Sequence, residues 1–149
     1  RHAKFMLPTE QMGFKYIISI EGNDVASNLK WILASNSLCL MPAPRFEIWF
    51  MEGRLEAGKH YVQVRDDFAD LEEKIHYYER HADEALEIIR NANDYVAQFF
   101  NEDRERLISL LVLAKYFALT GQYDPDRKVA DLIFPANPEA SLDSISPAG

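Results

Sequence analysis

A short polar segment between two apolar stretches contains the residues with which a protein could hold a phosphate group. It begins with Glu21 and Gly22 and ends with Lys30. Free backbone N–H groups, the first turn of a helix and a nearby cation are features that bind phosphate oxygens. Gly22 would let a ligand approach the backbone, because glycine has no side chain and adopts positive φ freely. Ser27, Asn28 and Lys30 would add hydrogen bonds and charge.

The same segment has a simpler interpretation. A Gly-Asn-Asp turn before a helix is more often a plain cap, in which Asn23 or Asp24 accepts hydrogen bonds from the first N–H groups of the helix. The glycine-rich fingerprint of dinucleotide sites and the P-loop lysine motif are both missing from the sequence. The residues alone therefore predict a pocket, and the phosphate site is a hypothesis.

Three neighbouring carboxylates, Asp66, Asp67 and Asp70, suggest either a metal site or a polar turn. No glycine-centred loop follows them, which counts against a calcium-type site. Asp70 and Glu73 fit a capping box that opens the next helix. We therefore expect a turn and a helix cap here, and no metal.

The remaining acids and histidines have ordinary structural interpretations. Glu47 lies in an aromatic segment, and a single acid in such a segment is expected in solvent. We expect His60 to be a structural histidine that is hydrogen-bonded to the backbone. His76 and His81 are five residues apart and do not share a helix face, so we expect them at the surface.

These candidates are positioned by a predicted β–α–β unit. Residues 14–20 are β-branched and aromatic, which is typical of a strand covered on both faces. Residues 25–35 predict a helix, and residues 37–41 predict a second buried strand. The polar segment thus follows the carboxyl end of the first strand, where open α/β sheets bind ligands. Residues 60–64 alternate in polarity and predict a further strand.

The second half of the chain is predicted to be helical. One helix should run from Leu71 to about Arg80 and a second over residues 83–100, while a third should be capped by Asn101 and end at Gly121. The side chains expected to face inward from the last two helices are Ala85, Ile89, Ala92, Val96, Phe99, Leu107, Leu110, Leu111, Ala114 and Phe117. Prolines and small residues from Asp124 onward predict a mobile tail.

Composition limits the possible functions. The 149 residues, 48% hydrophobic and 27% charged, suffice for one ordinary globular domain. A net charge of −8 argues against a nucleic-acid surface. No apolar run reaches the length of a membrane span. Cys39 is the single cysteine, which is consistent with a reducing compartment.

The chain opens with Arg1, without an initiator methionine or a signal-peptide pattern. We therefore expect a fragment or a processed piece. We expect a cytoplasmic location, or a peripheral one at the inner membrane.

Five segments follow one another along the chain: KYIISIEGNDVASNLKWILASNSLCLMP over residues 15–42, Glu47-Ile48-Trp49-Phe50, Leu55, HYVQV over residues 60–64 and DDFADLE over residues 66–72. Together they resemble the C-terminal half of glycosyltransferase family 90. That family includes capsule-associated sugar transferases, protein O-glucosyltransferases and xylosyltransferases, and bacterial lipopolysaccharide-core transferases. The resemblance covers roughly residues 12–117 and is strongest for the lipopolysaccharide group.

The resemblance implies that the polar segment is a donor-diphosphate loop and that Glu47 contacts the donor. The implied contacts to the nucleotide sugar are Glu21, Gly22, Asn23, Asp24, Val25, Ala26, Ser27, Asn28, Lys30 and Glu47. Family members often have an arginine where this chain has Asn28, so Lys30 would provide the cation here. Glu21 matches an Asp of some members and differs from the Arg of others.

The expected fold is α/β: a short, mostly parallel, Rossmann-like sheet followed by a helical run, as in the C-terminal half of a GT-B transferase. Residues 1–13 would be an incoming arm, residues 14–121 the donor-binding domain and residues 122–149 a flexible tail. The implied activity transfers a sugar from a nucleoside-diphosphate sugar to a glycan, in lipopolysaccharide-core or capsule synthesis. A UDP-sugar is the first candidate co-substrate, without cofactor or metal. The catalytic base would lie in the N-terminal half of such an enzyme, so this chain should be inactive alone.

Two other classes of function stay open. One is a Rossmann-like nucleotide-binding module of another enzyme, such as an oxidoreductase, although the missing glycine fingerprint counts against it. The other is a noncatalytic interaction domain that uses residues 49–51 as an exposed apolar patch.

Overall fold

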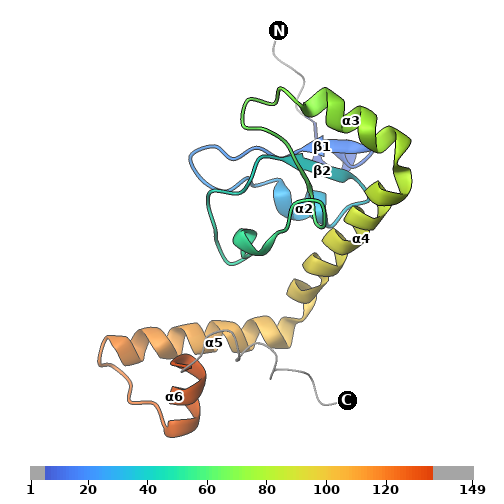
Figure 1. Cartoon of the computed structure of the whole chain (residues 1–149). Coiled ribbons are helices and arrows are strands. Elements are labelled where there is room, and N and C mark those ends of the chain that lie inside the picture. Colours follow the sequence, from blue (N-terminus) through green and yellow to red (C-terminus); the bar gives the residue numbers. More distant parts are fainter. Residues whose placement is uncertain (1–5, 136–149) are drawn as a thin grey trace. The chain divides into compact units, whose positions relative to one another are not determined.

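Three short parallel strands form the sheet in the computed structural model, which describes residues 6–135 (Figure 1). Their order in the sheet is that of the chain: β1 (Tyr16–Ile18), β2 (Leu38–Met41) and β3 (Val62–Gln63). Ile17 pairs with Cys39, and Leu40 pairs with Val62. The predicted α/β class with a parallel sheet is confirmed. The first strand is shorter than expected, and Phe14 and Ile20 at its ends are exposed.

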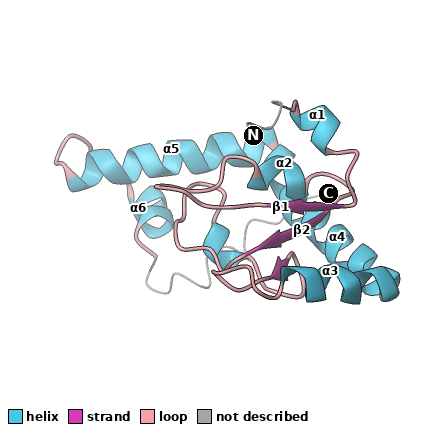
Figure 2. Cartoon of the chain, turned by 90° about the horizontal axis from the view of Figure 1, so that it is seen from above, coloured by secondary structure: helices cyan, strands magenta, loops and turns pink. Residues whose placement is uncertain are grey.

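The central strand β2 is buried on both faces, because its side chains alternate between two apolar cores. Cys39 and Met41 belong to one core, with helix α2 (Leu29–Leu33) and the C-terminal half of α4 (Ala82–Ala97). Leu38 and Leu40 belong to the other, with helix α3 (Leu71–Arg80) and the start of α4. Figure 2 shows α2 and α3 on opposite sides of the strands. Burying a side chain of the size of Leu38 or Leu40 stabilises the fold by about 1.5–3 kcal/mol.

Cys39 lies in the middle of β2 with 2% of its surface exposed. Burial raises the pKa of its thiol to about 12, so the thiol is neutral at physiological pH. Its role in the sheet is to pack as a small apolar residue.

Helix α2 begins later than predicted. It covers Leu29–Leu33 rather than residues 25–35, and neither Asn23 nor Asp24 caps it. The amide of Asn28 accepts from the Ser19 hydroxyl at 2.9 Å and donates to the Ile18 carbonyl at 3.2 Å. This tertiary contact ties Asn28 to the end of β1. The residues between Gly22 and Asn28 therefore form turns and bends, not a first helical turn.

Helices α3 and α4 agree closely with the prediction, and a 3₁₀ turn, η2 (Gln98–Phe100), extends α4. The inward face of α4 is turned slightly, because Ile88 is fully buried and Ile89 only partly. The expected capping box at Asp70 is wrong. Its carboxylate instead accepts from the Arg65 backbone N–H at 2.9 Å and closes the turn before α3.

The chain divides into two compact units between Phe100 and Asn101. In the second unit, α5 (Glu102–Leu119) begins as predicted, with the Asn101 side chain accepting from Arg104 N at 3.0 Å. Gly121, at φ +70°, follows its end. Leu107 and Leu110 were expected inward, but both are exposed.

The prediction of a mobile tail from Asp124 is wrong for the residues that the structure describes. Helix α6 (Arg127–Ile133) packs on α5, and its cap is Asp126, which accepts from Val129 N at 3.0 Å. Residues 136–149 lie outside the described part of the chain.

At the other end, the predicted arm contains a short helix, α1 (Pro8–Gln11). The Glu10 carboxylate closes this helix by accepting from Leu7 N at 2.7 Å. Residues 1–5 of the arm lie outside the described range. Over residues 6–135, no helix combines the length and the apolar character needed to cross a membrane.

Candidate functional site

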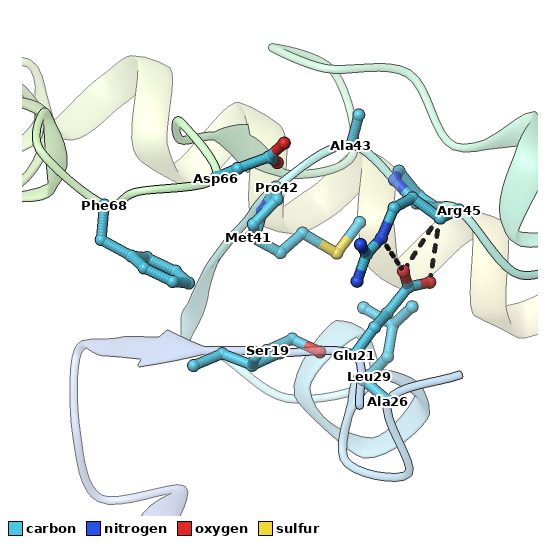
Figure 3. Close-up of a pocket in the computed structure, with 12 residues that line it drawn as sticks. Ser19, Glu21, Ala26, Leu29, Met41, Pro42, Ala43, Arg45, Asp66 and Phe68 are labelled. Atoms are coloured by element: carbon cyan, nitrogen blue, oxygen red, sulfur yellow. Dashed lines mark hydrogen bonds and ion pairs between the residues drawn. The ribbon is translucent and has the colours of Figure 1, made fainter. Parts of the chain in front are cut away.

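A cavity of about 250 Å³ lies at the carboxyl ends of the three strands (Figure 3). We call it the strand-end cavity. Residues 19–21 reach it from the end of β1, residues 42–45 from the end of β2, and Asp66 and Phe68 from the segment after β3. The sheet thus places a cavity where parallel α/β sheets bind ligands, as the sequence predicted.

The polar side of the cavity is made by Glu21 and Arg45, which face each other in Figure 3. Arg45 N donates to both oxygens of the Glu21 carboxylate, at 3.1 and 3.2 Å. Phe46 N donates to Oε1 at 3.3 Å, and Arg45 Nε lies 3.4 Å from Oε2. The Glu21 side chain is 15% exposed and that of Arg45 is 67% exposed, so the cation is open to solvent.

The apolar side of the cavity is made by Ala26, Leu29, Met41 and Phe68. Phe68 has a positive φ of 56°, which is uncommon for a bulky residue and shapes the turn before α3. Asp66 is exposed on the same rim, and its carboxylate can accept hydrogen bonds from hydroxyl groups. The apolar wall suits a flat ring, the carboxylates can accept hydrogen bonds from hydroxyls, and Arg45 is the cation among the lining residues.

Lys30, the predicted cation, lies elsewhere. Its Nζ is 3.5 Å from the Glu52 carboxylate and about 5.5 Å from the ring centres of Trp49 and Phe50 (5.6 and 5.4 Å). Glu52 is 1% exposed and also accepts from Ile48 N at 2.9 Å. Lys30 therefore connects α2, to which it belongs, to residues 49–52. It is not among the residues that line the strand-end cavity.

The other predicted contacts are dispersed. Glu21 and Ala26 line the strand-end cavity, whereas the Asn28 side chain is hydrogen-bonded to Ser19 at the end of β1. Five further predicted contacts do not line the cavity. Val25 is partly buried, and the exposed ones are Gly22, Asn23, Asp24 and Ser27. Glu47 is also exposed, and its carboxylate packs over Gly53. A Cβ atom on Gly53 would lie 3.3–3.4 Å from the atoms of that carboxylate.

Gly22 does not have the positive φ that was expected of it; among the described glycines, Gly58 and Gly121 do. The freedom of the Gly22 backbone is therefore not used in this structure.

The sequence patterns considered above did not predict Arg45 and Phe68 as residues of the cavity. Arg45 follows Pro42, Ala43 and Pro44 directly after a buried strand, which is the position that the strand-end rule marks. That rule, applied to the second and third strands as well as the first, could have found both residues.

His60 is buried, and its Nδ1 accepts from Glu56 N at 2.9 Å, which confirms a structural histidine. Burial, aided by nearby Lys59, lowers the pKa of His60 and keeps it neutral. His76 is exposed as expected, between Glu72 and Glu79. His81 is half-buried and stacks on Tyr77.

The apolar patch expected over residues 49–51 is not continuous. Trp49 is 62% exposed, but Phe50 is 1% exposed and packs edge-on against Trp49 and Tyr95. Within residues 6–135, no group of three or more His, Cys, Asp or Glu side chains is arranged to hold a metal ion.

A parallel sheet with a polar-rimmed cavity at the carboxyl ends of its strands is the arrangement in which open α/β proteins bind ligands. Residues 2–135 match the model of Glycosyl transferase family 90, and the chain belongs to this family.

Relatives in this family come from distant organisms. Over 118 residues the chain is 59% identical to O-glucosyltransferase LpsA of Dichelobacter nodosus. The aligned region covers 79% of this chain and 37% of that protein. Over 115 residues it is 27% identical to human Protein O-glucosyltransferase 3, which covers 76% of this chain and 22% of that protein. The chain thus spans less than two fifths of the length of either relative.

Proposed function

We propose that this chain is the donor-binding part of a glycosyltransferase that moves a sugar from a nucleoside-diphosphate sugar to a glycan acceptor. The observation that carries the proposal is the strand-end cavity, with Arg45 on its rim, in a chain of glycosyltransferase family 90. The name of the LpsA relative, an O-glucosyltransferase, supports a glucosyl donor. We propose an acceptor in lipopolysaccharide core or capsule. UDP-glucose is the first donor to test.

The cavity can hold part of such a donor. Its volume of about 250 Å³ is smaller than that of sites that enclose a whole drug-sized ligand, which is about 300–1,000 Å³. We propose that the base and ribose lie against the apolar wall near Phe68 and Asp66, with the diphosphate toward Arg45. The sugar would extend beyond the rim, toward the acceptor side of a GT-B enzyme.

We propose further that residues 1–149 bind the nucleotide but do not transfer the sugar. Transfer requires donor, acceptor and base to be held in line, and the gain in effective molarity is lost when one of them is missing. The acids in the described residues that fall near the cavity, Glu21 and Asp66, have roles on its donor side in this proposal.

Calorimetry with UDP, UDP-glucose, GDP and ADP, beside a transfer assay on the same sample, tests both statements. Ala43→Phe should block the cavity, because Ala43 is exposed on its rim. Ala34→Phe, at the exposed C-cap position that follows α2 and away from the lining, is the matched control. We expect UDP binding that Ala43→Phe abolishes and Ala34→Phe leaves unchanged.

No heat of binding at millimolar UDP, roughly the weakest useful affinity, would remove the donor-site proposal. Sustained sugar transfer by residues 1–149 alone would contradict the proposal that the chain is inactive by itself.

A further inference from the structure

The Glu21 carboxylate is held by the kinds of group that usually bind external anions. Two successive backbone N–H groups, of Arg45 and Phe46, point at it, and the Arg45 guanidinium lies beside them. The segment before them includes Pro42 and Pro44, which have no N–H, so the donors gather at its end. Convergent backbone N–H groups with an arginine are a common arrangement for phosphate oxygens.

The ion-pair part of this contact is weak. Arg45 is 67% exposed, and ion pairs with so exposed a partner contribute little to stability. A phosphoryl group bound to the same donors would stand within a few ångströms of the Glu21 carboxylate. Two like charges that close repel each other strongly in a partly buried site. Both anions cannot keep these donors, so a ligand must displace the carboxylate.

We infer that the N–H groups of Arg45 and Phe46 and the Arg45 guanidinium form the phosphoryl subsite of the strand-end cavity, and that Glu21 occupies this subsite until a ligand displaces it. The inference rests on the proposed donor-binding function and names the residues that contact the diphosphate. The rearrangement is one of hydrogen bonds, with no covalent step.

This arrangement has a consequence for selectivity. A ligand must bring enough negative charge to replace Glu21, so nucleoside diphosphates are favoured and an uncharged nucleoside is not. Glu21 thus sets a threshold for the charge of the ligand, and removing its charge should lower that threshold.

The test compares Glu21→Gln with Glu56→Gln in the full chain. Gln keeps an oxygen that can accept from Arg45 N and Phe46 N but lacks the charge. Glu56 is a matched control, because it is an exposed acid in an ion pair with Lys59, away from the cavity lining. Calorimetry with UDP and with inorganic pyrophosphate gives the affinities, and thermal unfolding checks that each variant is folded.

We expect Glu21→Gln to bind both probes about three- to tenfold more tightly than the unmodified chain, a range typical of one half-exposed charge-assisted contact. Glu56→Gln should change neither affinity. Arg45→Met should weaken both probes, whereas Arg90→Met, an exposed arginine on α4, should not.

Unchanged or weaker binding by a folded Glu21→Gln, with measurable binding by the unmodified chain, would overturn the inference and leave the proposed function standing. Absence of binding in the unmodified chain and in Glu21→Gln alike would overturn both. If Glu21→Gln is unfolded, the carboxylate is a structural clamp and the inference also fails.

Discussion

At the scale of single residues, two glycines of this chain have opposite conformations. Gly22 has no positive φ, and no atom lies within 4 Å of where its Cβ would be. Gly58 has a φ of +76°, in the region that side chains with a Cβ rarely adopt. Substitution at these positions should therefore have opposite effects.

We predict that Gly22→Ala is neutral or stabilises the chain by about 0.4–1 kcal/mol, because alanine restricts the unfolded chain and fits the folded one. Gly58→Ala should destabilise by about 1–2 kcal/mol, because alanine is strained at that backbone angle. Urea unfolding followed by circular dichroism measures both. Equal costs at the two sites would contradict the backbone assignment.

At the scale of elements, the pair of Lys30 and Glu52 connects α2 to the loop before β3. Glu52 is 1% exposed and Lys30 is 26% exposed, so loss of the cation leaves a carboxylate buried without its counterion. We predict that Lys30→Met destabilises by about 2–3 kcal/mol, somewhat less than for a fully buried pair. Glu52→Gln, which keeps an acceptor for Ile48 N, should cost about 1 kcal/mol.

The double variant Lys30→Met with Glu52→Gln separates this pair from its surroundings, since interacting residues give non-additive costs. We expect its cost to be well below the sum of the two single costs. Lys59→Met is the control, because Lys59 pairs with Glu56 at the surface and should cost under about 1 kcal/mol. A Lys30→Met cost no larger than that of Lys59→Met would rule out the connection.

The elements also show which features the sequence could predict. Strong local patterns predicted the parallel strands, the span of α3 and the Asn101 cap, because period and capping act within a few residues. The start of α2 depends on the contact between Asn28 and Ser19, which no local pattern contains. Lys30 lies outside the cavity lining, and Arg45 lies within it, for the same reason: each side chain pairs with an acid that is distant along the chain, Glu52 and Glu21 respectively.

At the scale of the whole molecule, every residue that lines the strand-end cavity lies in the unit before Asn101. The two apolar cores of the sheet are also complete within that unit. We predict that a chain ending at Phe100 folds and binds UDP within about twofold of the affinity of the full chain. Loss of UDP binding by this shorter chain, with its circular dichroism spectrum intact, would assign part of the site to residues 101–149.

The rate at which a thiol reagent labels the buried Cys39 reports on opening of the sheet. A thiol reagent attacks the thiolate, and burial keeps this one both neutral and covered. Modification therefore requires β2 to separate from its neighbours, so the labelling rate depends on how readily the sheet opens. Because no other cysteine competes for the reagent, the rate reports this event alone. A ligand that binds only the closed form slows this labelling as its occupancy rises, so the labelling rate measures ligand binding.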